Sequence, residues 1–319
     1  MSPLAVVAFL DGRLGHEKQT RGLIAALARL TPLTVTYNTL PPSSFKTVAL
    51  DFAVYLVALA KRPAVPAGDQ IDLIIGTGTW THLPMLILKK ERGGRVVTCM
   101  TPGLLTRGRL DLCLVPQHDR LRPAANIFRT VGPPSPAFCP TSRQAGRGLI
   151  LVGGLDPKSH RWRSELTMAQ IKTVVDRTPA LKWTISSSPR TPAAMIGRLA
   201  DFAGGRAGKV EFYRAADTPA GWIEQQYAAN EVVWVTADSV SMIYESLTAG
   251  CGVGVLPVDW RQKNNKFQRS LCYLLENRLI VSYEAWLAGQ AVPAPGPGLN
   301  EAARCAAEIL RRWWPERLP

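Results

Sequence analysis

The residues with the clearest chemical potential begin in a short polar segment that follows an apolar run. The segment Asp11 to Gln19 (DGRLGHEKQ) follows the run Leu4 to Leu10 and precedes an amphipathic stretch. Gly12 and Gly15 allow close approach of a ligand, and a helix start favours an anion or a developing oxyanion. We therefore expect His16 at a binding edge, where its imidazole can accept a proton. The alternative is a plain tight turn in which His16 caps the helix.

A second polar segment follows an apolar run that ends at Thr236 and opens another amphipathic stretch. Asp238 or Ser239 is a natural N-cap, and the free amides that follow would bind a diphosphate. Ser241 and Glu245 are four residues apart and share a helix face, so the Glu245 carboxylate would reach ribose hydroxyls. The alternative is a capped helix with a solvated glutamate.

Three further positions suit a phosphorylated ligand. Gly153 and Gly154 end an apolar run and allow backbone approach. Arg190, in the segment SSSPRTP, could make bidentate contacts to phosphate. Lys266 follows another apolar run and could neutralise a leaving phosphate. The competing interpretations are a tight turn, an exposed arginine and a solvated basic helix.

The remaining histidines offer one more candidate pair. His118 and Asp119 follow an apolar run and could form a base site on the acceptor side, although adjacency alone is a weak signal. His82 and His160 have no evident partner and are interpreted as structural. The six cysteines contain no CxxC pair, and with four histidines no zinc-type spacing can be assembled, so no metal is expected.

These residues need strands and helices to position them. Short apolar runs rich in β-branched residues alternate with helical patterns, which predicts parallel strands buried on both faces. The predicted strands are Leu4–Leu10, Leu33–Tyr37, Ile71–Ile75, Val96–Cys99 and Leu112–Val115, then Leu149–Val152, Trp183–Ser186, Val210–Tyr213, Val232–Thr236 and Gly252–Leu256. The fold class is therefore α/β, with two Rossmann-like, doubly wound parallel-sheet domains.

A proline- and glycine-rich stretch from residue 132 to residue 148 separates the two sets of strands. This composition is typical of a linker, so we place the domain boundary near residue 140, between domains 1–140 and 141–319. A final helix over about residues 300–314 is expected to pack back on the N-terminal domain. Two such domains would present the carboxyl ends of their sheets to a common cleft, where these folds bind ligands.

The 319 residues include 38 Lys and Arg against 24 Asp and Glu, a formal net charge of +14. An anionic partner would be nucleic acid, an acidic membrane surface or a phosphorylated small molecule. The basic residues are scattered in pairs, which disfavours a disordered nucleic-acid arm, and no nucleic-acid partner is expected. With 46% hydrophobic and 19% charged residues, the chain is a folded globular protein.

The longest apolar run, Val48–Ala60, is too short to cross a bilayer, which takes about 20 residues. We interpret it as a buried helix or as a helix that touches a membrane, because Lys61 and Arg62 follow it. The N-terminus lacks a positive leader and resembles a first strand. The cytoplasm is the expected location, with peripheral contact to the inner face of the cytoplasmic membrane as an open alternative.

Taken together, the motifs resemble the family named after the plant elongated-mitochondria fission protein, bacterial members of which are classed as glycosyltransferases. The resemblance covers nearly the whole chain and is most specific from Asp238 to Met242. Its segments are Gly15–Gln19, Pro116–Asp119, Gly153–Gly154, Ser188–Pro192, Thr236–Met242 and Lys266–Phe267. Three residues depart from the family pattern: Tyr244 and Ser246 flank Glu245, and Pro189 replaces the first of two arginines.

The resemblance implies a GT-B-like fold, with the nucleotide on the C-terminal domain and the acceptor on the N-terminal one. It implies a metal-independent glycosyltransferase that moves a sugar from a nucleotide-sugar donor to a lipid-linked or lipopolysaccharide acceptor of the cell envelope. The implied donor site comprises Gly153, Gly154, Arg190, Asp238, Ser239, Ser241, Met242, Glu245 and Lys266. The implied acceptor-side loop comprises Gly12, Gly15 and Gln19, and the catalytic candidates are His16, His118 and Asp119.

Two alternatives remain open at this point. One is a nucleotide-sugar epimerase on the same fold, which would turn over without an acceptor. The other is a membrane-surface recruiter or scaffold without enzymatic activity, as the role of the plant relative in fission would suggest. Fold analogy alone does not choose between these functions.

Overall fold

The computed structural model describes residues 1–41, 70–136 and 143–319. The apolar run Val48–Ala60 lies outside the described residues. Within these residues, no helix is both long and apolar enough to span a membrane. The chain divides into two compact units, Met1–Ala137 with Asn300–Pro319, and Phe138–Leu299. The division falls close to residue 140, where the sequence predicts a boundary, and the last helix belongs to the first unit.

The first unit contains a six-stranded parallel sheet in the order β2-β1-β3-β4-β5-β6. The strands are β1 (Leu4–Leu10), β2 (Leu33–Thr39), β3 (Leu73–Thr77), β4 (Arg95–Cys99), β5 (Leu112–Pro116) and β6 (Ile127–Thr130). The helices are α1 (Leu14–Ala28), α3 (His82–Arg92), α4 (Leu104–Arg107) and α11 (Glu301–Trp313), with 3-10 turns η1 (Thr79–Thr81), η2 (Gln117–Asp119) and η4 (Pro315–Arg317). Apolar side chains of α1 and α11 pack on one face of the sheet, and those of α3 pack on the other.

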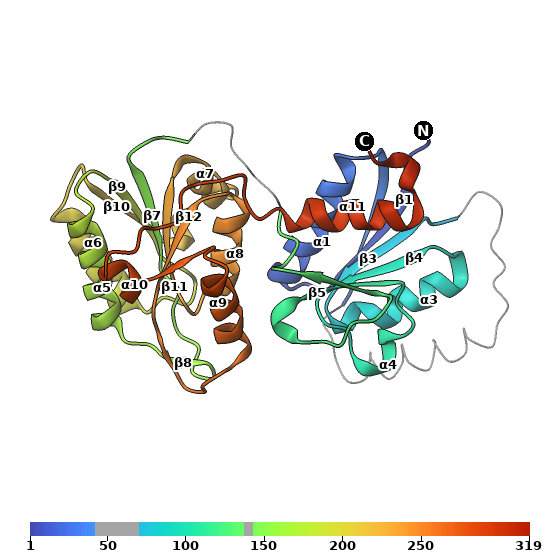
Figure 1. Ribbon diagram of the computed structural model, residues 1–319, viewed down its shortest axis with the longest axis horizontal. Helices are drawn as coiled ribbons and strands as arrows, with labels where there is room; N and C mark the ends of the chain where they lie inside the picture. The colour runs from blue at the N-terminus through green and yellow to red at the C-terminus, as the bar shows by residue number, and fades with distance from the viewer. Residues whose placement is uncertain (42–69, 137–142) are drawn as a thin grey trace. The chain divides into compact units, whose positions relative to one another are not determined.

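The second unit repeats this design with a parallel sheet in the order β10-β9-β7-β11-β12-β14. Its strands are β7 (Arg147–Leu151), β9 (Lys182–Ser186), β10 (Val210–Tyr213), β11 (Val232–Thr236), β12 (Gly252–Leu256) and β14 (Val281–Ser282), and β8 (His160–Arg161) pairs with β13 (Asp259–Trp260). The helices are α5 (Ser164–Arg177), α6 (Ala193–Gly204), α7 (Trp222–Ala229), α8 (Val240–Thr248), α9 (Lys266–Glu276) and α10 (Tyr283–Leu287), with the 3-10 turn η3 (Ala215–Asp217). Figure 1 shows α5, α6 and α10 on one face of this sheet and α7, α8 and α9 on the other.

Each sheet has a point at which the strand order reverses. In the first sheet, β1 is followed on one side by β2 and on the other by β3. In the second, β7 is followed on one side by β9 and β10 and on the other by β11. Loops at the carboxyl ends of strands diverge at such a point, and open α/β sheets bind ligands there. The loops after β1, β3, β7 and β11 are therefore the candidate ligand-binding loops.

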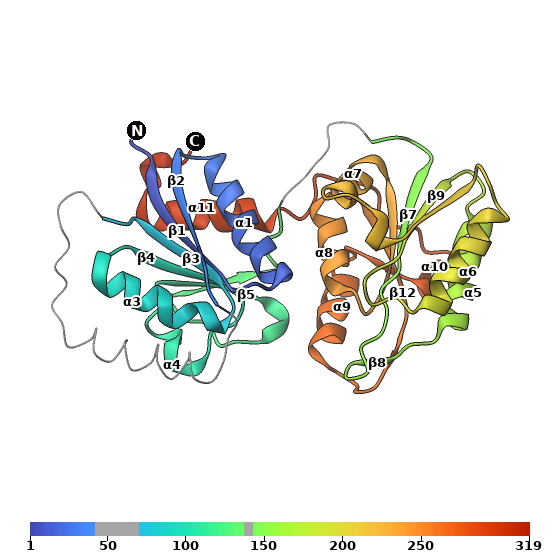
Figure 2. The same cartoon turned by 180° about the vertical axis from the view of Figure 1, so that it is seen from behind.

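The final helix completes the core of the first unit, although it is the last helix of the chain. Figure 2 shows α11 beside α1, seen from behind. Cys305, Ala306, Ile309 and Leu310 of α11 are fully buried in the same cluster as the α1 side chains. At the start of α11, the Glu301 carboxylate accepts a hydrogen bond from the Val131 amide at 3.0 Å. The helix is amphipathic, and this unit supplies the apolar partner that its buried stripe requires.

The observed strands correct the prediction in two respects. The second strand, β2, is not buried on both faces: its residues after Leu33 are half-buried or exposed because it forms the edge of the sheet. The strands β6, β8, β13 and β14 were not predicted, since each has only two to four residues and lies at an edge or in a small side ribbon. Gly250, which follows the C-cap residue of α8, lies at φ +76° and ends the helix in a left-handed conformation.

Truncation of a buried α11 side chain should destabilise the first unit selectively. We expect Ile309→Ala to lower its free energy of unfolding by about 2 to 5 kcal/mol, because the cavity lies in a closed core. Hydrogen exchange by mass spectrometry should show faster exchange in β1 and β3 and no change in β7 and β11. The half-exposed Leu166→Ala serves as the control and should leave both sheets unchanged. Equal acceleration in both sheets would contradict the division into units.

Candidate functional site

The loops after β7 and β11 are joined by hydrogen bonds at the switch point of the second sheet. The Gly153 amide donates to the Thr236 hydroxyl at 2.8 Å, and the Gly154 amide donates to the Asp238 carboxylate at 3.1 Å. Because β7 and β11 are neighbouring parallel strands, their carboxyl ends must meet. The two glycines and Asp238, which are separated by more than 80 residues, thus form one cluster.

Arg190 joins this cluster from the loop after β9. Its guanidinium donates to Asp238 Oδ2 at 2.8 Å and to the Ser239 hydroxyl at 3.2 Å. The Asp238 side chain is 1% exposed, whereas that of Arg190 is 41% exposed. The buried carboxylate therefore holds one edge of a guanidinium whose remaining donors face outward. This arrangement suits an arginine that binds a phosphate, since a guanidinium can bond two partners at once.

The packing of the glycines explains why no side chain is tolerated in the turn. A Cβ added at Gly153 would lie 2.2 Å from Asp238 Oδ2. One added at Gly154 would lie 2.0 Å from the Arg190 carbonyl oxygen and 2.5 Å from the Thr191 nitrogen. The glycines thus serve close packing of three loops within the protein. This is a different reason from the close approach of a substrate that the sequence suggested.

The start of α8 leaves its first amides available. Ser239 occupies the N-cap position, but no side chain caps the helix. Ser239 is thus the N-cap residue, as predicted, but neither its side chain nor that of Asp238 bonds a helix amide; both accept from Arg190. The first amides of an α-helix have no acceptor within the helix and carry partial positive charge. Ser241 and Met242, exposed and half-buried respectively, lie in this first turn.

Glu245 lies one turn further along α8 and is half-buried rather than fully solvated. The Tyr227 hydroxyl of α7 lies 3.4 Å from Glu245 Oε2. Burial and the neighbouring Glu245 carboxylate raise the pKa of Tyr227 well above its ordinary value, so the phenol stays protonated as a donor. Tyr227 thereby fixes one oxygen of Glu245 beside the start of the helix.

His160 supports the glycine turn from outside the predicted set. Its Nε2 donates to the Gly154 carbonyl at 3.0 Å, and its Nδ1 lies 2.7 Å from the Ser159 hydroxyl. This pattern matches the structural role predicted for it. Lys266 is not brought into the cluster by any described contact: it is exposed at the first turn of α9, with its ammonium 5.0 Å from the centre of the Phe267 ring.

In the first unit, the switch point holds a histidine–carboxylate pair. His16 Nδ1 lies 2.7 Å from Asp11 Oδ2, with the Asp11 side chain 3% and the His16 side chain 16% exposed. Gly78, at φ +93° after β3, lies against the ring: a Cβ there would be 2.5 Å from His16 Nδ1. With Nδ1 bonded to Asp11, Nε2 is the nitrogen that can accept a proton. His16 does not cap α1, whose N-cap position is Arg13.

The three acceptor-side residues surround this pair. Gly12 adopts φ +78°, a left-handed conformation that turns the chain from β1 into α1. A Cβ at Gly15 would meet no atom within 4 Å, so the surface beside His16 is open there. Gln19 bonds back to the Gly15 carbonyl at 3.2 Å, on the same turn of the helix.

The His118 and Asp119 pair is arranged less favourably. His118 Nε2 lies 3.7 Å from Asp119 Oδ1, which is beyond hydrogen-bond distance. Asp119 instead accepts a hydrogen bond from the Thr101 hydroxyl at 2.5 Å. His82 is buried between Thr98 and Thr106, and burial lowers its pKa to about 4, so it is structural as predicted.

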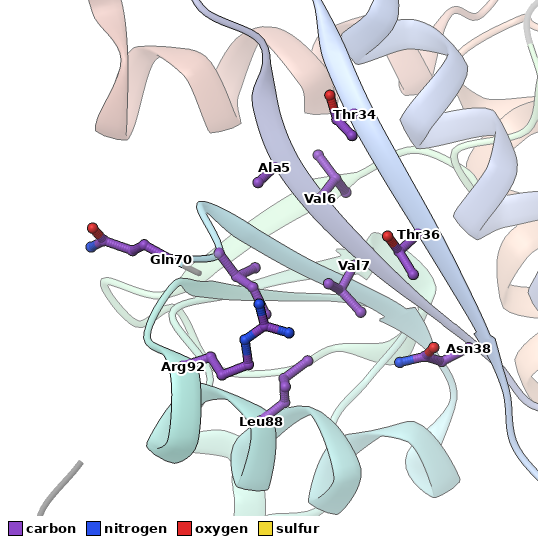
Figure 3. Close-up of a pocket in the computed structure, with 10 residues that line it drawn as sticks. Ala5, Val6, Val7, Thr34, Thr36, Asn38, Gln70, Leu88 and Arg92 are labelled. Carbon is purple, nitrogen blue, oxygen red and sulfur yellow. The ribbon is translucent and has the colours of Figure 1, made fainter. Parts of the chain in front are cut away.

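The first unit also has a pocket of about 300 Å³ that lies away from these residues. Figure 3 shows Thr34, Thr36 and Asn38 of β2 on one side of it and Arg92 of α3 on another. Gln70, which precedes β3, also lines the pocket. Its lining thus includes the amino-terminal side of the sheet, opposite the edge where this fold class binds ligands. We therefore do not assign the candidate site to it.

Sequence reasoning missed the partners that orient the predicted residues. Asp11, Gly78, Thr191 and Tyr227 were not proposed as site residues. The Thr191 hydroxyl bonds the Gly153 carbonyl at 2.5 Å and accepts from the Ser188 amide at 2.8 Å. Asp11 could have been found, because it is the first polar residue after β1. Gly78 and Tyr227 come from distant parts of the chain, so no local pattern marks them.

Comparison with known proteins gives a family and a fold. A family model described as mitochondrial fission ELM1 matches residues 14–313. Among curated proteins, none matches the sequence.

Several solved structures share the fold at low identity. A structure described as a UDP-N-acetylglucosamine 2-epimerase from Listeria monocytogenes is 12% identical, covers 98% of this chain and 97% of its own, and has a TM-score of 0.56. The glycosyltransferase of kitacinnamycin is 15% identical with full coverage of both chains and a TM-score of 0.51. A UDP-glucosyltransferase from Polygonum tinctorium is 10% identical, covers 98% and 93%, and has a TM-score of 0.52. These likenesses confirm the predicted GT-B-like fold class.

The glycine turn gives a direct test of the cluster. We expect Gly154→Ala to destabilise the second unit by about 1 to 3 kcal/mol, because the added Cβ meets backbone atoms that cannot move independently. The matched control is Gly197→Ala in α6, where a Cβ meets nothing within 4 Å and should add about 0.5 to 1 kcal/mol of stability. Urea unfolding followed by circular dichroism measures both. A neutral Gly154→Ala would show that the three loops do not pack as described.

Proposed function

The chain belongs to the mitochondrial fission ELM1 family, and we propose that it is a metal-independent glycosyltransferase that uses a nucleotide-sugar donor. The acceptor is a glycan of the cell envelope, either lipid-linked or part of lipopolysaccharide. One observation carries the proposal: a half-exposed arginine, held by a buried carboxylate, stands beside an uncapped helix start at the switch point of the second sheet.

The donor diphosphate is proposed to bind the first amides of α8 and the guanidinium of Arg190. Both supply positive charge where negative charge grows as the bond between sugar and diphosphate breaks. Lys266 is proposed to add charge from the first turn of α9. These groups together would supply the stabilisation that a metal ion supplies in other transferases, which is why no metal is proposed.

The nucleoside is proposed to bind beside the diphosphate, with its ribose hydroxyls donating to Glu245. The position supports this role, because Glu245 is one helical turn from the first amides of α8. Tyr227 occupies one carboxylate oxygen at 3.4 Å and thereby limits the rotation of the side chain. Gly153 and Gly154 contribute by fixing Asp238 rather than by touching the ligand.

The first unit is proposed to bind the acceptor, with His16 as general base. The acceptor hydroxyl oxygen attacks the anomeric carbon, the bond to the diphosphate oxygen breaks, and the hydroxyl proton passes to His16 Nε2. Asp11, at 2.7 Å from Nδ1, holds the required tautomer and stabilises the imidazolium that forms. The geometry favours His16 over His118, because the carboxylate of Asp119 is engaged by Thr101.

A nucleotide-sugar epimerase is the second candidate, because the fold is shared with a protein described as a UDP-N-acetylglucosamine 2-epimerase. The two functions differ in the need for an acceptor. Incubation with a UDP-sugar alone, followed by NMR of the sugar, separates them: an epimerase converts the sugar, whereas a transferase leaves it intact or hydrolyses it slowly.

Ligand binding tests the donor site, with calorimetry on a panel of uridine, guanosine, cytidine and adenosine diphosphates and on pyrophosphate. We expect Arg190→Ala to weaken both the preferred nucleotide and pyrophosphate by about tenfold to a hundredfold, since a charged hydrogen bond is lost. Glu245→Gln should weaken the nucleotide by about tenfold and leave pyrophosphate unchanged. Arg198→Ala, on the exposed face of α6, is the control and should bind as wild type does.

Folded wild-type protein that binds no member of this panel would refute the donor site. If Arg190→Ala and Glu245→Gln weaken the affinity for pyrophosphate equally, the proposal that Arg190 binds the diphosphate and Glu245 the ribose is refuted. Because Arg190→Ala leaves Asp238 without its ion-pair partner, Arg190→Lys is measured alongside it. Lysine keeps the charge but lacks the planar fork of donors that a guanidinium has, so an intermediate affinity is expected.

Turnover tests the proposed base. With water as acceptor, release of the nucleoside diphosphate from the preferred donor should fall about a hundredfold or more in His16→Gln, with donor affinity unchanged. Asp11→Asn should also lower the rate, because an amide cannot stabilise the imidazolium. His118→Gln is the comparison variant. A larger loss in His118→Gln than in His16→Gln would move the base to the other loop.

A further inference from the structure

The loops after β4 and β5 carry an exposed apolar and basic surface that the donor and acceptor sites do not use. Leu104 is 83% exposed and Leu105 is 76% exposed, and both belong to the short helix α4, which has no buried residue. A single exposed leucine is ordinary in a folded protein. Two adjacent ones that project from a short helix require an explanation.

Four arginines lie in the same two loops as this pair of leucines. Arg107 and Arg109 follow in the same loop, and Arg120 and Arg122 lie in the loop after β5. With the described residues, Arg109, Arg120 and Arg122 form no ion pair. We call these six residues, Leu104, Leu105, Arg107, Arg109, Arg120 and Arg122, the leucine–arginine surface.

The two loops are held together by hydrogen bonds, so the surface is continuous. The Asn126 side-chain amide donates to the Arg107 and Leu110 carbonyls at 2.7 and 2.9 Å. Thr101 and Asp119 join the loops a second time, at 2.5 Å. Both loops follow neighbouring strands of one parallel sheet, which places them at the same edge.

The acidic groups of these loops do not cancel the positive charge. Asp111 is bonded to the Lys89 ammonium at 2.7 Å and to the Val96 amide. Asp119 is bonded to Thr101. The positive charge that remains comes from the exposed Arg109, Arg120 and Arg122 and from the half-buried Arg107. This combination suits a surface that offers both an apolar interior and phosphate groups.

The same edge of the sheet holds the histidine pair. A Cβ at Gly103, which precedes α4, would lie 3.8 Å from the side chain of Thr79. Thr79 in turn follows Gly78, which lies against His16. The surface is therefore connected to the proposed acceptor site within the first unit: Gly103 lies beside Thr79, Thr79 follows Gly78, and Gly78 lies against His16. Figure 1 shows α4 at the margin of this unit, beside α3.

We propose that the leucine–arginine surface docks on an anionic lipid bilayer, with Leu104 and Leu105 inserted among the acyl chains and the arginines bound to lipid phosphates. Leucine burial supplies apolar free energy, and each arginine near an anionic surface adds to the attraction. The aliphatic parts of the arginine side chains extend along the apolar boundary, while their guanidinium groups reach the phosphates. Docking at this edge would bring a lipid-linked acceptor to His16. That last link rests on the proposed function, whereas the lipid contact does not.

Sedimentation with vesicles tests the proposal on the full chain. The vesicles are phosphatidylcholine alone and phosphatidylcholine with phosphatidylglycerol. We expect wild type to bind the anionic vesicles and Leu104→Ser with Leu105→Ser to reduce the partition coefficient about tenfold. Arg109→Gln with Arg122→Gln should reduce it by a similar factor, as should added salt.

Two matched double variants of the second unit control for lost leucines and lost charge. Leu166→Ser with Leu275→Ser removes two other exposed leucines, and Lys182→Gln with Arg214→Gln removes two other exposed cations. Both should bind vesicles as wild type does. Circular dichroism and nucleotide affinity are measured for every variant and should not change, since none of these residues belongs to the proposed donor site.

The outcomes are separable. Failure of wild type to bind anionic vesicles overturns the proposal. Equal binding by the variants of the leucine–arginine surface and by the control variants also overturns it, because the lipid contact would then lie elsewhere. The proposal is also overturned if wild type binds RNA but no vesicles and the arginine variant loses the RNA binding. The surface would then bind nucleic acid. Vesicle binding in a protein that binds no nucleotide would leave the docking surface standing and refute the proposed function alone.

Discussion

The buried carboxylate of Asp238 is the interaction on which the second unit's candidate site depends. Asp238 lies in the loop after β11. Its carboxylate accepts hydrogen bonds from the Gly154 amide in the loop after β7 and from the Arg190 guanidinium in the loop after β9. A buried carboxylate is costly unless charge and hydrogen bonds compensate it, so the three loops must meet for the fold to be stable. Its other oxygen, Oδ1, is buried and has no hydrogen-bond partner among the described residues. The requirement for compensation thus positions the arginine that we propose to bind the donor.

The first unit meets the same topological constraint with different chemistry. Its strand order also reverses at the first strand, β1, and Asp11 and His16 follow that strand, with Gly78 packed on the imidazole. The second unit places cationic and amide groups at its switch point, and the first places a histidine–carboxylate pair. This difference is the basis on which we propose an acceptor unit and a donor unit. The leucine–arginine surface extends the acceptor edge toward lipid without using the residues that would do the chemistry.

Much of the fold was accessible from the sequence because buried parallel strands are marked by continuous β-branched runs. The predicted bounds of β1, β10, β11 and β12 agree with those observed, and the last helix lies in the first unit, where we expected it to pack. The short edge strands were not predicted, because two to four residues carry too little pattern. Arg190 and Asp238, which the sequence predicted as parts of one site, lie together in the structure. The sequence did not predict the contacts around them: the glycines pack against protein, Ser239 bonds an arginine, and Tyr227 reaches Glu245 from another helix. Such partners depend on tertiary contacts that no local spacing encodes.

The most direct test of the account is a crystal structure of the chain with a bound nucleoside diphosphate. The account predicts that the phosphates lie against the first amides of α8, with Arg190 in contact with them and the ribose hydroxyls on Glu245. Asp238 should remain buried and bonded to Gly154. A nucleotide bound at the pocket beside β2 and α3, or bound at the second sheet without contact to α8 and Arg190, would contradict the assignment of the donor site.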